Sequence, residues 1–354
     1  MTDPLAQRPV PLLTPELPGT SGIVRVSEDD FAVEEIPLYQ PSGTGEHLYL
    51  TVEKRGRTTP EVAAEIARAL GARERDVGTA GLKDKRAVTV QRISVATKAT
   101  VEEALQLAGE GYRVLAAARH GNKLRPGHLM GNRFRIVVRG TLAGALERAQ
   151  AICARLRAGG AANLFGPQRF GKSGDNAPLG RAILMRERTV RDRFLRRMAL
   201  SALQSELFNR CLAARIADGL FATAIDGDVL KKRATGGLFV CEDPAADAPR
   251  VASGEVDPAG PLPGHSLYQA RGEAARREAA VLADANVDPA SFAAGGAEME
   301  GARRTYRVVP DELRVEEAGA GALQISFVLP RGSYAVCVLR EITKTDAAQA
   351  DFPT

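Results

Sequence analysis

One carboxylate lies inside a short basic segment and could take part in catalysis. Asp84 is flanked by Lys83, Lys85 and Arg86 in the tetrapeptide KDKR. Nearby cations favour the ionised form of a carboxyl group, and an ionised carboxylate can act as a nucleophile. A tetrapeptide of this kind is more often a solvated turn. From these four residues alone, the solvated turn is the better interpretation.

A second segment matches a nucleotide-binding pattern. Residues 166–173, GPQRFGKS, satisfy the P-loop expression GxxxxGK[ST]. That loop requires a buried strand before it and a helix that opens at Lys172 and Ser173. The preceding AANLF is a weak strand, and we expect that residues 174–180, with two glycines and a proline, cannot start a helix. The sequence therefore argues against an NTPase.

The cysteines and histidines show no pattern of metal ligands. The four cysteines lie far apart and form no CxxC pair, which fits a reducing compartment. The four histidines show neither an HExxH motif nor clustered spacing. No metal site is predicted. The N-terminal segment lacks the basic start and apolar run of a signal peptide, and no apolar run reaches the roughly 20 residues of a membrane span. A cytoplasmic protein is expected.

Two segments carry an excess of positive charge. Residues 111–140 contain seven Lys or Arg, two His and no acid, and residues 181–197 contain seven Arg against Glu187 and Asp192. A solvated face usually mixes both signs, so such clusters favour a polyanionic partner. We predict a nucleic acid that lies across both halves of the chain and is bound chiefly through its phosphates.

The elements around Asp84 are predicted from the spacing of apolar residues. Their alternation indicates short strands at 22–26, 30–36 and 47–53. A helix is expected from Thr59, as its cap, to Gly71, with Pro60 in its first turn. Residues 78–95 form a charged loop that leads into a β-branched strand. This arrangement places Asp84 in a loop beside a sheet.

A further strand has one apolar and one basic face. In residues 133–140, Phe134, Ile136 and Val138 share one face, and the arginines lie largely on the other. A helix is expected to follow, with Leu142 on its apolar side.

The remaining chain changes character twice. From about residue 160 it contains loops, a basic helical stretch at 188–216 and a region rich in Ala, Pro, Gly and Asp at 242–302. We interpret this part as a second domain. Residues 323–330 return to strand alternation, and Ser333 is predicted to cap a final helix.

Several motifs, in order along the chain, resemble the TruD family of tRNA pseudouridine synthases. The longest are GLKDKRAVTVQ (81–91), RHGNKLRPGHLMGNRF (119–134) and NLFGPQRFG (163–171). Shorter ones are DFAVEE, DGD at 226–228, PLPG and GSYAVCVLRE. The resemblance spans about residues 22–345. Because ordered long motifs are far more specific than a single one, they reverse the interpretation of Asp84.

The resemblance implies an α+β fold with two domains. A pseudouridine synthase catalytic domain, with a mixed and largely antiparallel sheet, would comprise residues 1–157 and 309–354. An inserted α/β TRUD domain would occupy residues 158–308, and RNA would bind in the cleft between the two. The C-terminal strands would then complete the first domain, and the P-loop match would be an inter-domain loop.

The resemblance also implies the site residues. Asp84 matches the catalytic aspartate of the family. Residues that match or adjoin positions contacting the target nucleotide are Phe31, Lys83, Asn132, Phe134 and Tyr334. Val336 departs from the family pattern, in which we would expect Thr. The basic residues expected to contact RNA are Lys85, Arg86, Arg119, His120, Lys123, Arg125, Arg133, Arg135 and Arg169.

The implied reaction isomerises uridine to pseudouridine, by family at position 13 of tRNA. It breaks the glycosidic bond and rejoins the ribose to C5 of the same base, so no cofactor is expected. The target base would be flipped out of the RNA. Whether Asp84 attacks C1′ or abstracts a proton to form a glycal stays open. The alternative is a non-catalytic RNA-binding protein or RNA chaperone, against which an intact Asp84 argues. A monomer is expected.

Overall fold

A large sheet gathers strands from both ends of the chain. The computed structural model describes residue 5 and residues 9–171 and 173–345. The strands of this sheet are β1 (Ile23–Val24), β2 (Phe31–Pro37), β3 (His47–Arg55), β4 (Val77–Thr79), β5 (Val88–Ala96), β6 (Ala108–Gly109), β7 (Tyr112–His120), β8 (Leu129–Arg139), β15 (Asp311–Glu317) and β16 (Ala322–Pro330). The C-terminal strands therefore join a sheet that the N-terminal part begins.

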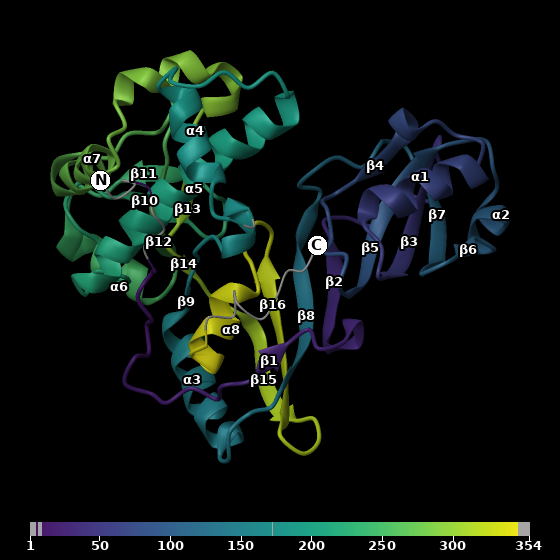
Figure 1. Cartoon of the computed structure of the whole chain (residues 1–354), viewed down its shortest axis with the longest axis horizontal. Coiled ribbons are helices and arrows are strands. Elements are labelled where there is room, and N and C mark those ends of the chain that lie inside the picture. Colours follow the sequence, from purple (N-terminus) through teal and green to yellow (C-terminus); the bar gives the residue numbers. More distant parts are fainter. Residues whose placement is uncertain (1–4, 6–8, 172, 346–354) are drawn as a thin grey trace.

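The order of these strands is β15-β16-β8-β2-β5-β3-β7-β6, with β1 paired to β8 and β4 to β5. Figure 1 shows the sheet extending from β15 and β16 to β6 at the right. β2 runs parallel to β5, and the other pairings of the described strands are antiparallel. The predicted mixed, largely antiparallel sheet is confirmed.

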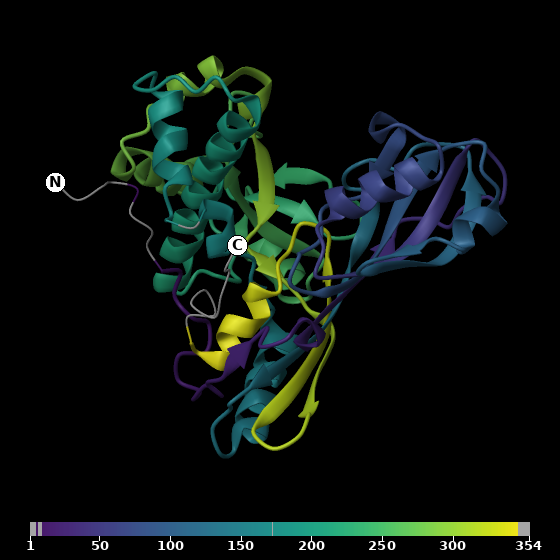
Figure 2. The same cartoon turned by 45° about the vertical axis from the view of Figure 1, so that its right-hand side comes forward.

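Two groups of helices cover the apolar face of the sheet. Phe134 of β8 lies opposite Val33 of β2 and Phe327 of β16, so these side chains share that face. The helices over this face are α3 (Ala145–Gly159) and α8 (Val336–Thr343) on the β2–β8–β16 part, and α1 (Thr59–Ala69) on the β3–β5–β7 part. Figure 2 shows α1 in the right-hand lobe, apart from α8. α2 (Val101–Leu105) packs beside β7.

A second unit lies between β8 and β15 in the sequence. The chain leaves and returns through β9 (Ala161–Ala162) and β14 (Arg307–Val308), which pair with each other. A four-stranded sheet follows the order β11-β10-β12-β13, with bounds Leu238–Val240, Val229–Lys232, Val256–Leu262 and Ala302–Thr305. The helices are α4 (Asn176–Leu184), α5 (Arg193–Ala217), α6 (Pro244–Ala252) and α7 (Gly272–Asp284).

The second unit shares an apolar core with the large sheet. Phe208 and Leu212 of α5 belong to the same buried cluster as Phe134 and Ile136 of β8. The described chain also contains the 3₁₀ segments η1 (Glu28–Asp30), η2 (Glu74–Asp76), η3 (Pro167–Phe170) and the longer, kinked η4 (Pro289–Met299). In the described ranges, we find no helix that combines the length and apolarity needed to cross a membrane.

Three predictions about helix ends are wrong. The cap of α1 is Thr58 and not Thr59, since the Thr58 hydroxyl accepts a hydrogen bond from the N–H of Glu61. Ser333 does not cap α8, because its hydroxyl donates to Asn163 Oδ1 at 3.0 Å. Leu142 precedes α3 and is 52% exposed, because the chain turns at the left-handed residue before the helix. The hydroxyls of Thr59 and Ser333 bond residues outside their own helices and therefore do not act as caps.

Residues 174–180 start a helix, contrary to the prediction. α4 begins at Asn176, and Pro178 lies in its first turn, where a backbone N–H has no intrahelical partner to lose. A P-loop helix would open at Lys172, which lies outside the described residues, and Ser173. The preceding strand β9 is only two residues long. The two-residue strand and the start of α4 at Asn176 therefore do not fit a P-loop.

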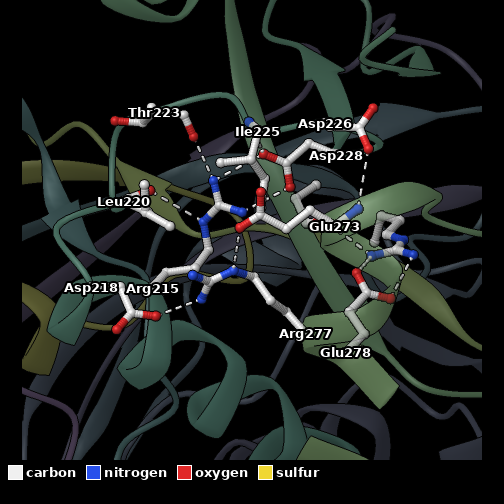
Figure 3. Close-up of polar contacts among 12 residues, drawn as sticks. Arg215, Asp218, Leu220, Thr223, Ile225, Asp226, Asp228, Glu273, Arg277 and Glu278 are labelled. Carbon is white, nitrogen blue, oxygen red and sulfur yellow. Dashed lines mark hydrogen bonds and ion pairs between the residues drawn. The ribbon is translucent and has the colours of Figure 1, made fainter. Parts of the chain in front are cut away.

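The DGD motif at 226–228 stabilises the second unit. Asp228 is 4% exposed, and its two carboxylate oxygens accept bonds from Arg215 at 2.8 and 2.9 Å (Figure 3). Burial raises the pKa of Asp228 even though Arg215 lies beside it. Asp226 accepts a bond from the N–H of Glu273 near the start of α7. Because both aspartates bond within this unit, their role is structural.

Candidate active site

A patch of polar side chains interrupts the apolar face of the large sheet. Lys54 of β3 lies opposite Thr89 of β5, and Glu35 of β2 lies opposite Asn132 of β8. Gln91 shares the face of Thr89, two residues further along β5. Lys54, Thr89, Gln91 and Glu35 are buried. The Thr89 hydroxyl and Gln91 Nε2 have no hydrogen-bond partner among the described residues. Buried charged groups require partners, and a neighbouring segment supplies them to Lys54 and Glu35.

That segment is residues 81–87, called here the Asp84 loop. The Lys83 ammonium lies 2.6 Å from Glu35 Oε2, and both side chains are buried. The backbone N–H of Lys83 donates to the Thr59 hydroxyl at 3.0 Å, and that hydroxyl donates to Gln91 Oε1 at 2.8 Å. Removing one partner of a buried ion pair is strongly destabilising, so the Lys83–Glu35 pair holds the loop to the sheet.

The Asp84 carboxylate is partly exposed and faces an arginine. Arg25 Nη2 lies 2.6 Å from Asp84 Oδ2, with side-chain exposures of 8% for Arg25 and 30% for Asp84. The Arg25 guanidinium also lies over the ring of Phe31, with Cζ 3.8 Å from the ring centroid. Arg25 follows β1 in the left-handed conformation, at a φ of 62°. One cation therefore contacts both Asp84 and an aromatic ring.

Two of the predicted nucleotide-contacting aromatic residues lie in the core. Phe31 is 3% exposed and Phe134 is 7% exposed. Their rings meet edge to face at 6.4 Å, and Phe134 stacks on Phe327 at 5.2 Å. These ring contacts fix the Phe31 ring on which the Arg25 guanidinium lies.

Asn132 carries an unused acceptor beside this core. Its Oδ1 is buried and has no hydrogen-bond partner among the described residues. An unsatisfied buried acceptor is costly unless a ligand or water bonds it. The sheet thus brings Phe31, Phe134, Asn132, Lys83 and Asp84 to one face.

Tyr334 contacts the second unit. The residue is 39% exposed, and its ring centroid lies 5.8 Å from that of Phe165. The Arg304 guanidinium lies between these parts, 4.3 Å from Phe165 and 5.9 Å from Tyr334, and donates to the carbonyl of Gly332 at 2.7 Å. Burial lowers the pKa of Arg304. Arg304 therefore ties the second unit to the segment that carries Tyr334.

Several predicted RNA contacts are occupied by bonds within the chain. The Arg169 guanidinium donates to the hydroxyl of Ser205 at 3.1 Å. Arg119 donates to the carbonyl of Thr97 at 2.9 Å, and the Lys123 ammonium to that of Arg75 at 2.7 Å. His120 Nδ1 accepts from the N–H of Ser42. Arg86 is half-buried in the Asp84 loop, whereas Lys85 and Arg125 are exposed.

Arg133 and Arg135 lie on the sheet face opposite Asn132 and Phe134, because successive strand residues alternate. Arg133 forms a bidentate pair with Glu312, at 2.5 and 3.3 Å. Arg135 is exposed. The basic strip of β8 and the Asp84 loop therefore occupy different faces.

Comparison with known proteins identifies the family. A family model described as tRNA pseudouridine synthase D (TruD) matches residues 10–191 and 188–342. The chain belongs to the TruD family. It is 55% identical over 346 residues to the tRNA pseudouridine synthase D of an Anaeromyxobacter species, covering 95% of this chain and 97% of the relative. The protein of that name from Thermus thermophilus is 46% identical over 339 residues, covering 95% and 93%.

A solved structure agrees with the TruD assignment. The crystal structure of the putative tRNA pseudouridine synthase D (TruD) from Methanosarcina mazei aligns with a TM-score of 0.75 at 25% identity, covering 96% of this chain and 97% of that chain. The family and the α+β fold class predicted from the sequence are thereby confirmed.

In this TruD family member, sequence reasoning missed the residues that support Asp84. Arg25 and Glu35 stand in short predicted strands, Lys54 directly follows one, and all three look like ordinary surface positions. Glu35 and Lys54 continue the buried face of their strands, which alternation alone shows. That signal could have marked them, because a charged residue in a buried register requires a partner.

Proposed function

We propose that this tRNA pseudouridine synthase acts at uridine 13 of tRNA, with Asp84 as the nucleophile. Members of the family are isomerases, and the position within tRNA rests on family resemblance. The observation that carries the proposal is a partly exposed Asp84 carboxylate on a loop that a buried ion pair anchors. We further propose that the protein acts as a monomer.

The two carboxylate oxygens of Asp84 would have different roles. Oδ2 is bound by Arg25 at 2.6 Å. We assign Oδ1 to attack on C1′ of the ribose, which breaks the C1′–N1 bond. The freed uracil anion then turns, and its C5 attacks C1′ as the C1′–O bond to Asp84 breaks, which restores the carboxylate. C5 then loses its proton, and N1 takes one up. Atoms and electrons balance without an oxidant or reductant.

Base capture would use the exposed ring and the unused acceptor. Tyr334 is 39% exposed, so its ring could stack on the flipped uracil. Asn132 Oδ1 could accept the uracil N3–H, because it has no partner among the described residues. For this geometry the catalytic domain would comprise residues 1–157 and 309–354, and the insert 158–308, with RNA contacting both.

The insert has more exposed arginines without an ion-pair partner among the described residues than β8 has. Five exposed arginines join no ion pair with another described residue: Arg186, Arg188, Arg191, Arg193 and Arg197. Phe194 lies among them and is 64% exposed. Basic groups beside an exposed aromatic ring suit the backbone and bases of RNA. We therefore place much of the phosphate contact on this surface.

Charge removal on this surface should weaken tRNA binding more than removal of a paired arginine. Arg193→Gln is expected to lower affinity and to reduce the slope of log K against log salt by about 0.7 to 0.9 per lost phosphate contact. Arg133→Gln is the matched control, because Glu312 already neutralises Arg133. Filter binding between low and moderate salt measures both slopes. Equal effects of the two variants would contradict this placement.

Pseudouridine mapping in cellular tRNA tests the proposed function. Deletion of the gene is expected to remove pseudouridine at position 13, and the wild-type gene to restore it. Unchanged modification in the deletion strain would overturn the choice of target. Loss of pseudouridine at another tRNA position would keep the activity and correct the site.

A further inference from the structure

A lysine is fully buried beneath the Asp84 loop. Lys54, near the end of β3, is 1% exposed and is among the largest buried side chains of the protein. The residues that precede it on the same strand face, Leu48, Leu50 and Val52, are apolar and fully buried. A buried ammonium is unfavourable unless hydrogen bonds compensate it. The Lys54 ammonium therefore requires hydrogen-bond acceptors, which an apolar side chain at this position would not need.

The ammonium of Lys54 is bonded to backbone carbonyls. Nζ lies 2.7 Å from the carbonyl oxygen of Asp84, 2.8 Å from that of Arg57 and 3.4 Å from that of Lys83. A protonated lysine has three N–H donors, so these three carbonyls can use all of them. Two of the acceptors belong to consecutive residues of the Asp84 loop. A single side chain thus links the sheet, the loop and the segment before α1.

We propose that Lys54 is a positioning residue, whose ammonium fixes the backbone of Lys83 and Asp84 so that the Asp84 carboxylate is held toward Arg25 and the substrate. This inference rests on the proposed role of Asp84. Side-chain bonds of Lys83 anchor one side of the loop to Glu35. Lys54 supplies the second anchor, directly at the peptide carbonyl of the reacting residue.

The charges around Lys54 give this anchor a pH dependence. Burial lowers its pKa to about 8; Lys83 lowers it as well, whereas Asp84 and Glu61 of α1 raise it. From β5, the facing residue is the uncharged Thr89. Below about pH 8 the ammonium donates three bonds, and above it the neutral amine has two donors and a lone pair. The hold on the loop should therefore weaken as the pH rises through about 8.

Lys54→Met removes the donors while keeping a long side chain. Since a misplacement of about 1 Å can cost about 100-fold, we expect the single-turnover rate constant to fall about 10- to 100-fold, with tRNA affinity within twofold of wild type. Val52→Ala is the control, because it lies on the same strand face and cannot hydrogen-bond the loop. It should lower the melting temperature and leave the rate constant of the folded enzyme unchanged.

A folded Lys54→Met variant with the wild-type rate constant would overturn the proposal. If that variant does not fold, the pH profile of the wild-type enzyme decides. The rate constant should decline above about pH 8, and Lys54→Arg, whose guanidinium stays charged, should lack that decline. A flat wild-type profile from pH 7 to 9.5 would then overturn it. Turnover by Asp84→Asn would instead remove the proposed function itself, so the two failures are distinguishable.

Discussion

Asp84→Asn is expected to bind tRNA normally and to form no measurable pseudouridine. Asparagine has nearly the shape of aspartate but no nucleophilic charge, and loss of a nucleophile costs on the order of 10⁴-fold or more. The amide can still meet Arg25, so the loop should keep its position. Single-turnover release of label from C5-tritiated uridine in tRNA, with binding measured in parallel, checks the result. Measurable turnover by the pure variant would remove Asp84 from the mechanism.

A second aspartate provides the control. Asp29 pairs with Arg55 at 2.5 Å, close to the 2.6 Å of the Arg25–Asp84 pair, but both Asp29 and Arg55 are at least half exposed. Exposed ion pairs contribute little to stability, because water screens them. Asp29→Asn should therefore leave turnover and stability close to wild type. Comparison of Asp84→Asn with Asp29→Asn separates the effect of the carboxylate's position from the effect of losing one negative charge.

The large elements of the fold could be predicted from the sequence. The alternation in residues 133–140 and 323–330 identified β8 and β16, because one face of each strand is buried against helices. The alternation does not reveal that these two strands pair, since pairing depends on contacts almost 200 residues apart. The family motifs implied only that the C-terminal strands complete the first domain, and not which strands pair. Helix ends were less predictable, as Thr59 and Ser333 use their hydroxyls in tertiary bonds.

The site could be predicted only in part. The motif around Asp84 and the order of the other motifs point to the catalytic loop. The cation beside Asp84 was expected among Lys83, Lys85 and Arg86, whereas Lys83 pairs with Glu35 and Arg25 occupies that place. Arg25 lies 59 residues away from Asp84 and in a left-handed conformation, which strand propensity does not predict. Without the register of the sheet, the sequence predicts neither that Arg25 is the partner of Asp84 nor that its side chain points toward Asp84.

Arg25→Met is expected to reduce kcat/KM by about 100-fold, because loss of the bond that orients the Asp84 carboxylate misplaces it, and a misplacement of about 1 Å can cost about 100-fold. The variant loses the bond to Asp84 Oδ2 and the cationic cover of the Phe31 ring. Arg55→Met is the matched control, because it removes an arginine from the exposed pair with Asp29. Steady-state kinetics with tRNA, together with melting curves, measure both variants.

The chemistry of the substitution separates two roles of Arg25. If its charge holds Asp84, Arg25→Lys should recover part of the activity, because lysine keeps the charge but lacks the planar group that stacks on Phe31. If Arg25 serves only to cover the core, both variants should lose melting temperature in proportion to their lost activity, since Phe31 is 3% exposed beneath it. A stable Arg25→Met enzyme with wild-type kcat/KM would exclude the ion pair from catalysis. Recovery of activity by Arg25→Lys without a change in melting temperature would assign the effect to the positive charge at position 25, which holds the Asp84 carboxylate.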